Sequence, residues 1–111
     1  NVSSRANIGQ GVLVNAGATI NFAASIADGV IVNTGANVDH HGELNFCCHV
    51  SPGANLAGNV RIGAQAWVGI GCAVIQNIKI GENSIVGAGS VIIRDVDKNL
   101  VVAGVPAKIM N

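Results

Sequence analysis

The chain is poor in aromatic residues and in charge. It has no tyrosine, and its aromatic residues other than histidine are Phe22, Phe46 and Trp67. Only 11% of its 111 residues are charged and the formal net charge is zero, so no basic surface for nucleic acid is expected. No apolar run approaches the length of a membrane span, and no signal peptide is recognisable. We therefore expect neither nucleic acid nor a membrane as a partner.

The three cysteines lack the spacing of a disulfide framework or a redox motif. Cys47 and Cys48 are adjacent and poorly placed to bridge, and Cys72 stands alone. Free thiols of this kind are typical of a reducing compartment, so we expect a cytoplasmic protein. The sequence begins without methionine, and we expect a fragment or a processed chain.

What the sequence does contain is a six-residue repeat. Every sixth residue from Val2 to Ile92 is aliphatic, with no insertion, and the residue two positions earlier is mostly small. Residues two apart on a strand face the same side, so each hexad presents one small and one large residue inward. Three positions after each aliphatic residue, Gly and Asn dominate, as a corner with positive φ requires.

A short strand and a tight corner every six residues predict an all-β parallel solenoid. Three hexads make one triangular coil of about 18 residues, which gives about five coils over residues 1–93. Lys98 stands where the next aliphatic residue is due. We therefore expect residues 94–111 to leave the coil as a capping tail of the same domain.

One outward face of the predicted prism is apolar. Each coil contributes one outward residue to this face, directly before its inward aliphatic residue. These residues are Leu13, Ile31, His49, Trp67 and Ile85. A stripe of this kind would be exposed in a lone prism, so it predicts an interface.

The histidines are the least expected side chains of the repeat. His40 falls at a corner and His49 lies nine residues later on the apolar stripe. Nine residues are half a coil, so the two side chains lie on opposite sides of one prism, well over ~10 Å apart. They can share a site if the corner of one subunit docks on the stripe of the next, a contact that a ring such as a trimer closes.

Four segments resemble a known family. They are VNTGANVDHHG, HVSPGANLAGNVRIG, GENSIVGAGSVIIRDV and VVAGVPAKIM. The pattern resembles the hexapeptide-repeat acyltransferases, and in particular the sialic acid O-acetyltransferase and bacillosamine N-acetyltransferase family. This resemblance implies a left-handed parallel β-helix and a homotrimer with sites between subunits. It also implies acetyl-CoA as co-substrate, no metal, and an amino or hydroxyl group of a sugar or nucleotide sugar as acceptor.

The resemblance also implies site residues. His40 matches the catalytic base and Asn33 an asparagine near it, while His49 matches a histidine that contacts the acetyl group or pantetheine from the neighbouring subunit. Positions that match the lining of the coenzyme A cleft are Gly58, Ile70 and Ala88. Positions that match the tail motif near the nucleotide end are Gly104, Pro106 and Lys108, of which the lysine suits a phosphate.

The expected chemistry is general base catalysis. A neutral imidazole at His40 would take a proton from the acceptor as it attacks the thioester, with Asp39 as a carboxylate that orients the base. His49 or a backbone N–H would stabilise the oxyanion. A second interpretation makes His40 and His41 turn residues, because His tolerates positive φ better than most residues.

Two departures from the family and two rival functions stay open. His41 stands where the family often has a carboxylate, and the family's N-terminal nucleotide-sugar-binding domain is not in this sequence. The acceptor, and the choice between N- and O-acetylation, are therefore unassigned. One rival is a non-catalytic β-helix scaffold. The other is a metalloprotein like the γ-class carbonic anhydrases, disfavoured because zinc needs three or four convergent ligands and no histidine pair has the required spacing.

Overall fold

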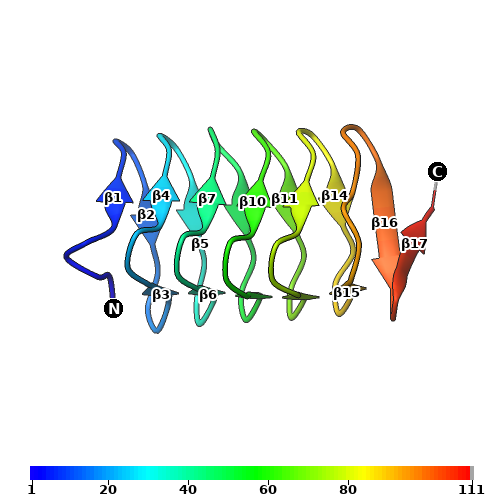
Figure 1. Cartoon of the computed structure of the whole chain (residues 1–111), viewed down its shortest axis with the longest axis horizontal. Helices are drawn as coiled ribbons and strands as arrows, with labels where there is room; N and C mark the ends of the chain where they lie inside the picture. Colours follow the sequence, from blue (N-terminus) through cyan, green and yellow to red (C-terminus); the bar gives the residue numbers. More distant parts are fainter. Residues whose placement is uncertain (111) are drawn as a thin grey trace.

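A computed structural model describes residues 1–110 and shows a three-sided prism of stacked coils. Its principal dimensions are 38 × 22 × 20 Å, and the coils follow one another along the long axis (Figure 1). All strands from β1 to β15 are two residues long, and every pairing among them is parallel. None of the described residues forms a helix long and apolar enough to cross a membrane.

The strands form one sheet on each side of the prism. Sheet A contains β3 (Thr19–Ile20), β6 (Asn37–Val38), β9 (Asn55–Leu56), β12 (Ala73–Val74) and β15 (Val91–Ile92). Sheet B contains β1 (Asn7–Ile8), β4 (Ser25–Ile26), β7 (Glu43–Leu44), β10 (Arg61–Ile62) and β13 (Lys79–Ile80). Sheet C contains β2 (Leu13–Val14), β5 (Ile31–Val32), β8 (His49–Val50), β11 (Trp67–Val68), β14 (Ile85–Val86), β16 (Val101–Gly104) and β17 (Ala107–Ile109).

The chain runs from sheet B to C to A and then to the next coil. We call the turns corner B–C, corner C–A and corner A–B after the sheets they join. The side chain expected to point inward on each strand is buried from Ile20 to Ile92, with at most 3% of its surface exposed. In the first coil Val2 and Ile8 are 46% and 42% exposed, since no coil lies before them. The predicted all-β parallel solenoid of about five coils is confirmed.

The corners adopt the predicted backbone conformation. From Gly11 to Gly89, every residue that lies three positions after an inward aliphatic residue has positive φ, including His41 at 59° and Cys47 at 55°. Non-glycine residues accept this conformation at a cost, which the coil-to-coil backbone hydrogen bonds offset, such as His41 N–H to Phe22 O at 3.2 Å. The exception is Arg5, which does not have positive φ.

The C-terminal tail continues the parallel pairing beyond residue 93, where the sequence suggested an end. Val96 bridges to Ile80 and Val102 pairs with Val86, so this last coil has 16 residues instead of 18. The shortening brings Val96 and Val102 inward and leaves Lys98 exposed. An antiparallel hairpin of β16 and β17 then caps the prism at its C-terminal end (Figure 1).

The apolar stripe on sheet C is open to solvent in the single chain. Leu13, Trp67 and Ile85 are 51%, 50% and 47% exposed. They follow one another on neighbouring strands, because Ile31 pairs with His49, His49 with Trp67 and Trp67 with Ile85. The predicted stripe is therefore a continuous outward surface.

Candidate active site

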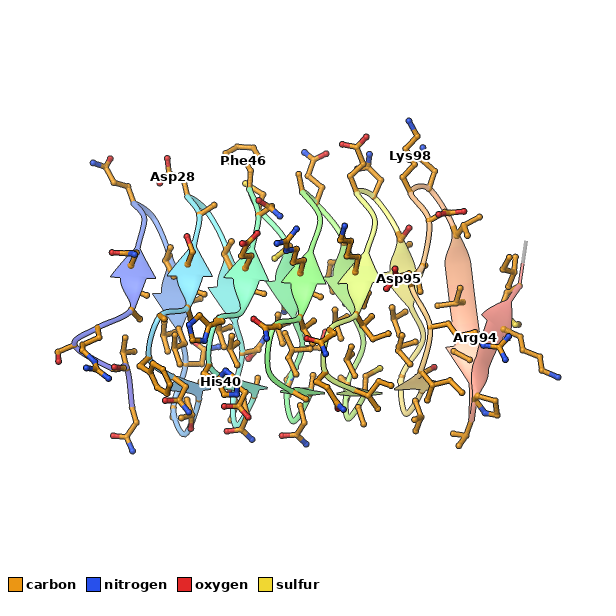
Figure 2. The ribbon with its side chains drawn as sticks, viewed as in Figure 1. Asp28, His40, Phe46, Arg94, Asp95 and Lys98 are labelled. Carbon is orange, nitrogen blue, oxygen red and sulfur yellow. The ribbon has the colours of Figure 1, made fainter. Side chains whose placement is uncertain are left out.

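His40 lies at corner A–B, two residues after the end of β6 (Figure 2). Its backbone N–H donates to Asp39 Oδ1 at 2.7 Å, and the side-chain amide of Asn21, one coil earlier, donates to the same oxygen at 3.1 Å. Within residues 1–110 no hydrogen bond joins the Asp39 carboxylate to the His40 ring. Asp39 therefore fixes the turn that carries His40 and does not bond to its imidazole.

The imidazole of His40 fills a slot between neighbouring coils. The Phe22 ring stacks on it, with centroids 5.7 Å apart and an interplanar angle of 20°. A Cβ built on Gly58, one coil later, would lie only 2.6 Å from His40 Cε1 and 2.7 Å from Nε2. Gly58, expected to line the coenzyme A cleft, therefore leaves room for the His40 imidazole of its own chain.

His41 is the hydrogen-bond partner of the His40 ring. The two Nδ1 atoms are 3.2 Å apart and the rings meet edge to face at 84°. Such a contact requires one Nδ1 to donate and the other to accept. When His40 donates, its Nε2 carries a lone pair, and no described residue hydrogen-bonds to that atom. His41 can thus serve as the acceptor that holds His40 in the form a base needs.

His49 occupies a different environment on β8. Its ring packs against Trp67, with centroids 4.3 Å apart, and burial lowers the pKa of His49 below its ordinary value of 6.5. The side-chain amide nitrogen of Asn33 lies 3.2 Å from His49 Nε2. A desolvated imidazole is held neutral near pH 7.

Asn33 lies at corner C–A and contacts His49 of the same chain. Its Oδ1 accepts hydrogen bonds from the Asn15 side-chain amide at 2.7 Å, from the Thr34 backbone N–H at 2.7 Å and from the Thr34 hydroxyl at 3.3 Å. The resemblance placed Asn33 near the base His40. Within one chain the structure instead groups it with His49, at the corner on the other side of sheet A.

Comparisons with known proteins find the same fold and repeat. A sequence profile described as "Bacterial transferase hexapeptide (six repeats)" matches residues 59–94. The acetyltransferase domain of PglB from Neisseria gonorrhoeae superposes with a TM-score of 0.98 at 44% identity, covering 99% of this chain and 54% of that chain. The chain belongs to the hexapeptide-repeat acyltransferases. The left-handed parallel β-helix expected for this family is confirmed by that superposition.

Two further solved structures show how far the likeness extends. PerB from Caulobacter crescentus, in complex with CoA and GDP-perosamine, has a TM-score of 0.98 at 45% identity, covering 99% of this chain and 53% of that one. Neisseria gonorrhoeae serine acetyltransferase shares the fold, with a TM-score of 0.68 at 24% identity, covering 100% of this chain and 42% of that one. The chain thus spans about half the length of PerB and of the PglB structure. A comparison with curated protein sequences finds no match.

The structure brings several expected cleft residues together beside His49. His49, Trp67, Ile70 and Ala88 line one groove of about 420 Å³ along sheet C and corner C–A. Ile70 is 60% exposed there, so its side chain is free to contact a ligand. Gly58 does not belong to this groove, since it lies with His40 at corner A–B.

The expected tail residues lie in the hairpin that extends the same sheet. Gly104 ends β16, and its N–H donates to the buried Ser90 hydroxyl at 3.1 Å. Pro106 and Lys108 line a mostly apolar hollow of about 470 Å³ at the C-terminal end. Sequence reasoning missed Ser90 as an anchor of this hairpin, because a serine on the small inward track looks like a space filler.

No cluster of three or more His, Cys, Asp or Glu side chains that could hold a metal occurs within residues 1–110. His40 and His41 contact each other, and His49 contacts Asn33 and Trp67. Sequence reasoning also missed Phe22 and Trp67 as ring partners of the two histidines. Each lies 18 residues from its histidine, and that spacing was the available signal.

Proposed function

We propose that this domain is an acetyl-CoA-dependent acetyltransferase that acts on an amino or hydroxyl group of a sugar or nucleotide sugar. The observation that carries the proposal is the held imidazole of His40, packed between Phe22 and Gly58 with Nε2 unoccupied. Relatives of the same fold support the substrate class. The PglB domain has been crystallised with acetyl coenzyme A, and PerB with CoA and GDP-perosamine.

The proposed reaction is direct transfer. His40 Nε2 accepts a proton from the acceptor amine or hydroxyl as that group attacks the acetyl carbonyl carbon. The carbonyl oxygen becomes an oxyanion in the tetrahedral intermediate. The C–S bond then breaks, and the sulfur of coenzyme A leaves with the proton that His40 holds. Two PerB structures in which one histidine is replaced, by alanine or by asparagine, also bind CoA and GDP-perosamine, which fits a histidine that acts in the chemical step rather than in binding.

The site is proposed to lie between subunits of a homotrimer. His40 lies at corner A–B and His49 lies on sheet C of the same chain, and their side chains make no contact. The exposed stripe of Leu13, Trp67 and Ile85 offers a surface on which the His40 corner of a neighbour can dock. A heterologous contact of this type closes as a ring. His40 of one subunit would then face His49 of the next.

The coenzyme is proposed to lie along corner C–A. His49, Ile70 and Ala88 would receive the acetyl group and the pantetheine, and Gly104, Pro106 and Lys108 the nucleotide end. Coils are spaced by ~4.8 Å, so the three coils from His49 to the hairpin span about 14 Å, a length suited to an extended pantetheine arm. Gly58 would border the same cleft from the neighbouring subunit, beside His40.

We further propose a cytoplasmic location, where acetyl-CoA is available. The three cysteines are free thiols in this structure, two of them buried, and burial raises the pKa of Cys48 to about 12. The two buried thiols, Cys48 and Cys72, are inert fillers that need no oxidising compartment.

The test combines binding with turnover. Calorimetry with acetyl-CoA should show saturable binding near one per chain, and the protein should acetylate an amino sugar linked to a nucleotide. His40→Ala should still bind acetyl-CoA but lose transfer. A well-folded protein that binds no acetyl-CoA would overturn the proposal and favour the scaffold function.

A further inference from the structure

A chain of polar side chains runs across three coils and ends on His49. Asn15 donates to Asn33 Oδ1 at 2.7 Å, and Asn33 Nδ2 lies 3.2 Å from His49 Nε2. Asn15 and Asn33 are 18 residues apart and occupy the same position at corner C–A. All three side chains are partly shielded from solvent.

The orientation of the Asn33 amide is fixed by its partners. Three donors converge on Oδ1, from Asn15, the Thr34 backbone and the Thr34 hydroxyl. Turning the amide over would place an NH₂ group against all of them. The oxygen therefore faces Asn15 and Thr34, and the NH₂ group faces His49.

That orientation determines which ring nitrogen of His49 carries the proton. An NH₂ group facing Nε2 requires a lone pair on Nε2, so the neutral ring carries its hydrogen on Nδ1. A hydrogen on Nε2 would point at the NH₂ group of Asn33, so that two donors would face each other. The burial that lowers the pKa of His49 also favours the neutral ring. No described residue hydrogen-bonds to Nδ1, so the Nδ1–H group is left for a ligand.

We propose that Asn33, supported by Asn15, is a positioning residue that holds His49 in its Nδ1–H tautomer. His49 then acts as a hydrogen-bond donor to the carbonyl oxygen of the bound acyl group and not as a second base. The part of this inference that concerns the acyl group rests on the proposed acetyltransferase function. The part that concerns the tautomer does not.

Asn33→Asp tests the inference with the smallest change. The carboxylate keeps the size of the side chain and keeps an oxygen for Asn15 and Thr34. It replaces the NH₂ group that faces His49 with an oxygen, which requires a hydrogen on Nε2. The matched control is Asn55→Asp on sheet A. Asn55 Oδ1 accepts from the Asn37 amide at 2.6 Å, so the same charge is added beside the same kind of coil-to-coil bond, away from both His40 and His49.

The first readout is nitrogen-15 NMR of protein labelled at histidine, at alkaline pH where the ring is neutral. Wild type and Asn55→Asp should show His49 protonated on Nδ1, and Asn33→Asp should show it protonated on Nε2. A wild-type ring protonated on Nε2 overturns the inference, and this result needs no variant to fold. An Asn33→Asp ring still protonated on Nδ1 overturns it as well.

The second readout is kinetic. Loss of one oxyanion donor should lower kcat for acetyl transfer about 10²-fold in Asn33→Asp, with a smaller change in KM for acetyl-CoA. Asn55→Asp should keep the wild-type kcat. Equal kcat values for wild type and Asn33→Asp would overturn the role in transfer. A wild-type protein without any acetyl transfer would instead overturn the proposed function, and the NMR result would still decide the tautomer.

Discussion

His40 and His49 have different surroundings, and the difference suits one ring to act as a base and the other as a hydrogen-bond donor. His40 stands at a corner, stacked on Phe22, and its ring bonds to another imidazole through Nδ1. His49 stands on a sheet beside Trp67, and its Nε2 is already engaged by an amide. In the proposed mechanism the His40 ring offers a lone pair to the substrate and the His49 ring offers an N–H group. The comparison shows that the partner of each ring, more than the presence of histidine, determines whether it can act as base or as donor.

The two regions also differ in what they need from a second chain. The His40 corner is completed by Phe22 and Gly58 of its own chain. The His49 face exposes Trp67 and Ile85 with nothing over them. A site that uses both histidines therefore needs the corner of one chain against the face of another.

The largest effect is expected at His40. His40→Ala should lower kcat for acetyl transfer by about 10²–10⁴, because the general base is lost. KM for acetyl-CoA should stay near wild type, and the urea midpoint should fall only slightly, since the ring is half-buried at corner A–B. Steady-state kinetics and urea unfolding measure these quantities. A variant that keeps its kcat would remove His40 from the mechanism.

A charge on the apolar stripe should separate the subunits. Ile85→Lys places an ammonium group at the proposed interface, where desolvating it is costly. The mass in solution should fall about threefold, from trimer to monomer, and transfer should fall with it although His40 is intact. Light scattering measures the mass. Ser25→Lys adds the same charge on the polar sheet B and should leave the trimer unchanged. A wild-type chain that is already a monomer would contradict the proposed assembly.

A single methyl group at Gly58 should disturb the His40 ring. Gly58→Ala would place its Cβ 2.6 Å from His40 Cε1, so the imidazole must move. A misplaced base should cost up to about 10²-fold in kcat, and overpacking about 1–3 kcal/mol of unfolding free energy. In a His40→Ala background the same change should cost little stability, because the ring that it meets is gone. A double-mutant cycle by urea unfolding that shows simple additivity would reject close packing between Gly58 and the His40 ring.

The smallest expected effect is on stability against pH. Burial lowers the pKa of His49 in the folded chain, so the unfolded chain binds the proton more readily. The contribution of His49 to stability is therefore fully present above pH ~6.5 and is lost as the pH falls from there through the lowered folded pKa. His49→Gln should flatten this part of the curve of unfolding free energy against pH. Parallel curves for wild type and variant would show that the burial of His49 does not matter for stability.

Much of the fold could be predicted from the hexads. The inward aliphatic residues and the corners with positive φ from Gly11 to Gly89 lie where the repeat places them. The last coil could not be predicted, since Lys98 occupied the expected inward place. The chain shortens that coil by two residues and brings Val96 inward instead. This two-residue change of register depends on which register buries more apolar surface. The local sequence does not show which one does.

The site could be predicted in outline only. Spacing placed His40 and His49 on different sides of the prism. It did not show that Asn33 bonds to His49, or that His41 meets His40 Nδ1, because both contacts depend on the direction of corner side chains. The roles assigned to Ile70, Ala88, Gly104, Pro106 and Lys108 remain predictions that ligand binding must test.

The most direct test of a shared site is to mix two inactive variants. His40→Ala and His49→Ala chains, unfolded together in equal amounts and refolded, would assemble at random into hybrid rings. If each site takes His40 from one chain and His49 from the next, about one quarter of the sites regain both histidines. We predict recovery of about one quarter of the wild-type acetyl transfer. A mixture no more active than the separate variants would contradict a site built between subunits.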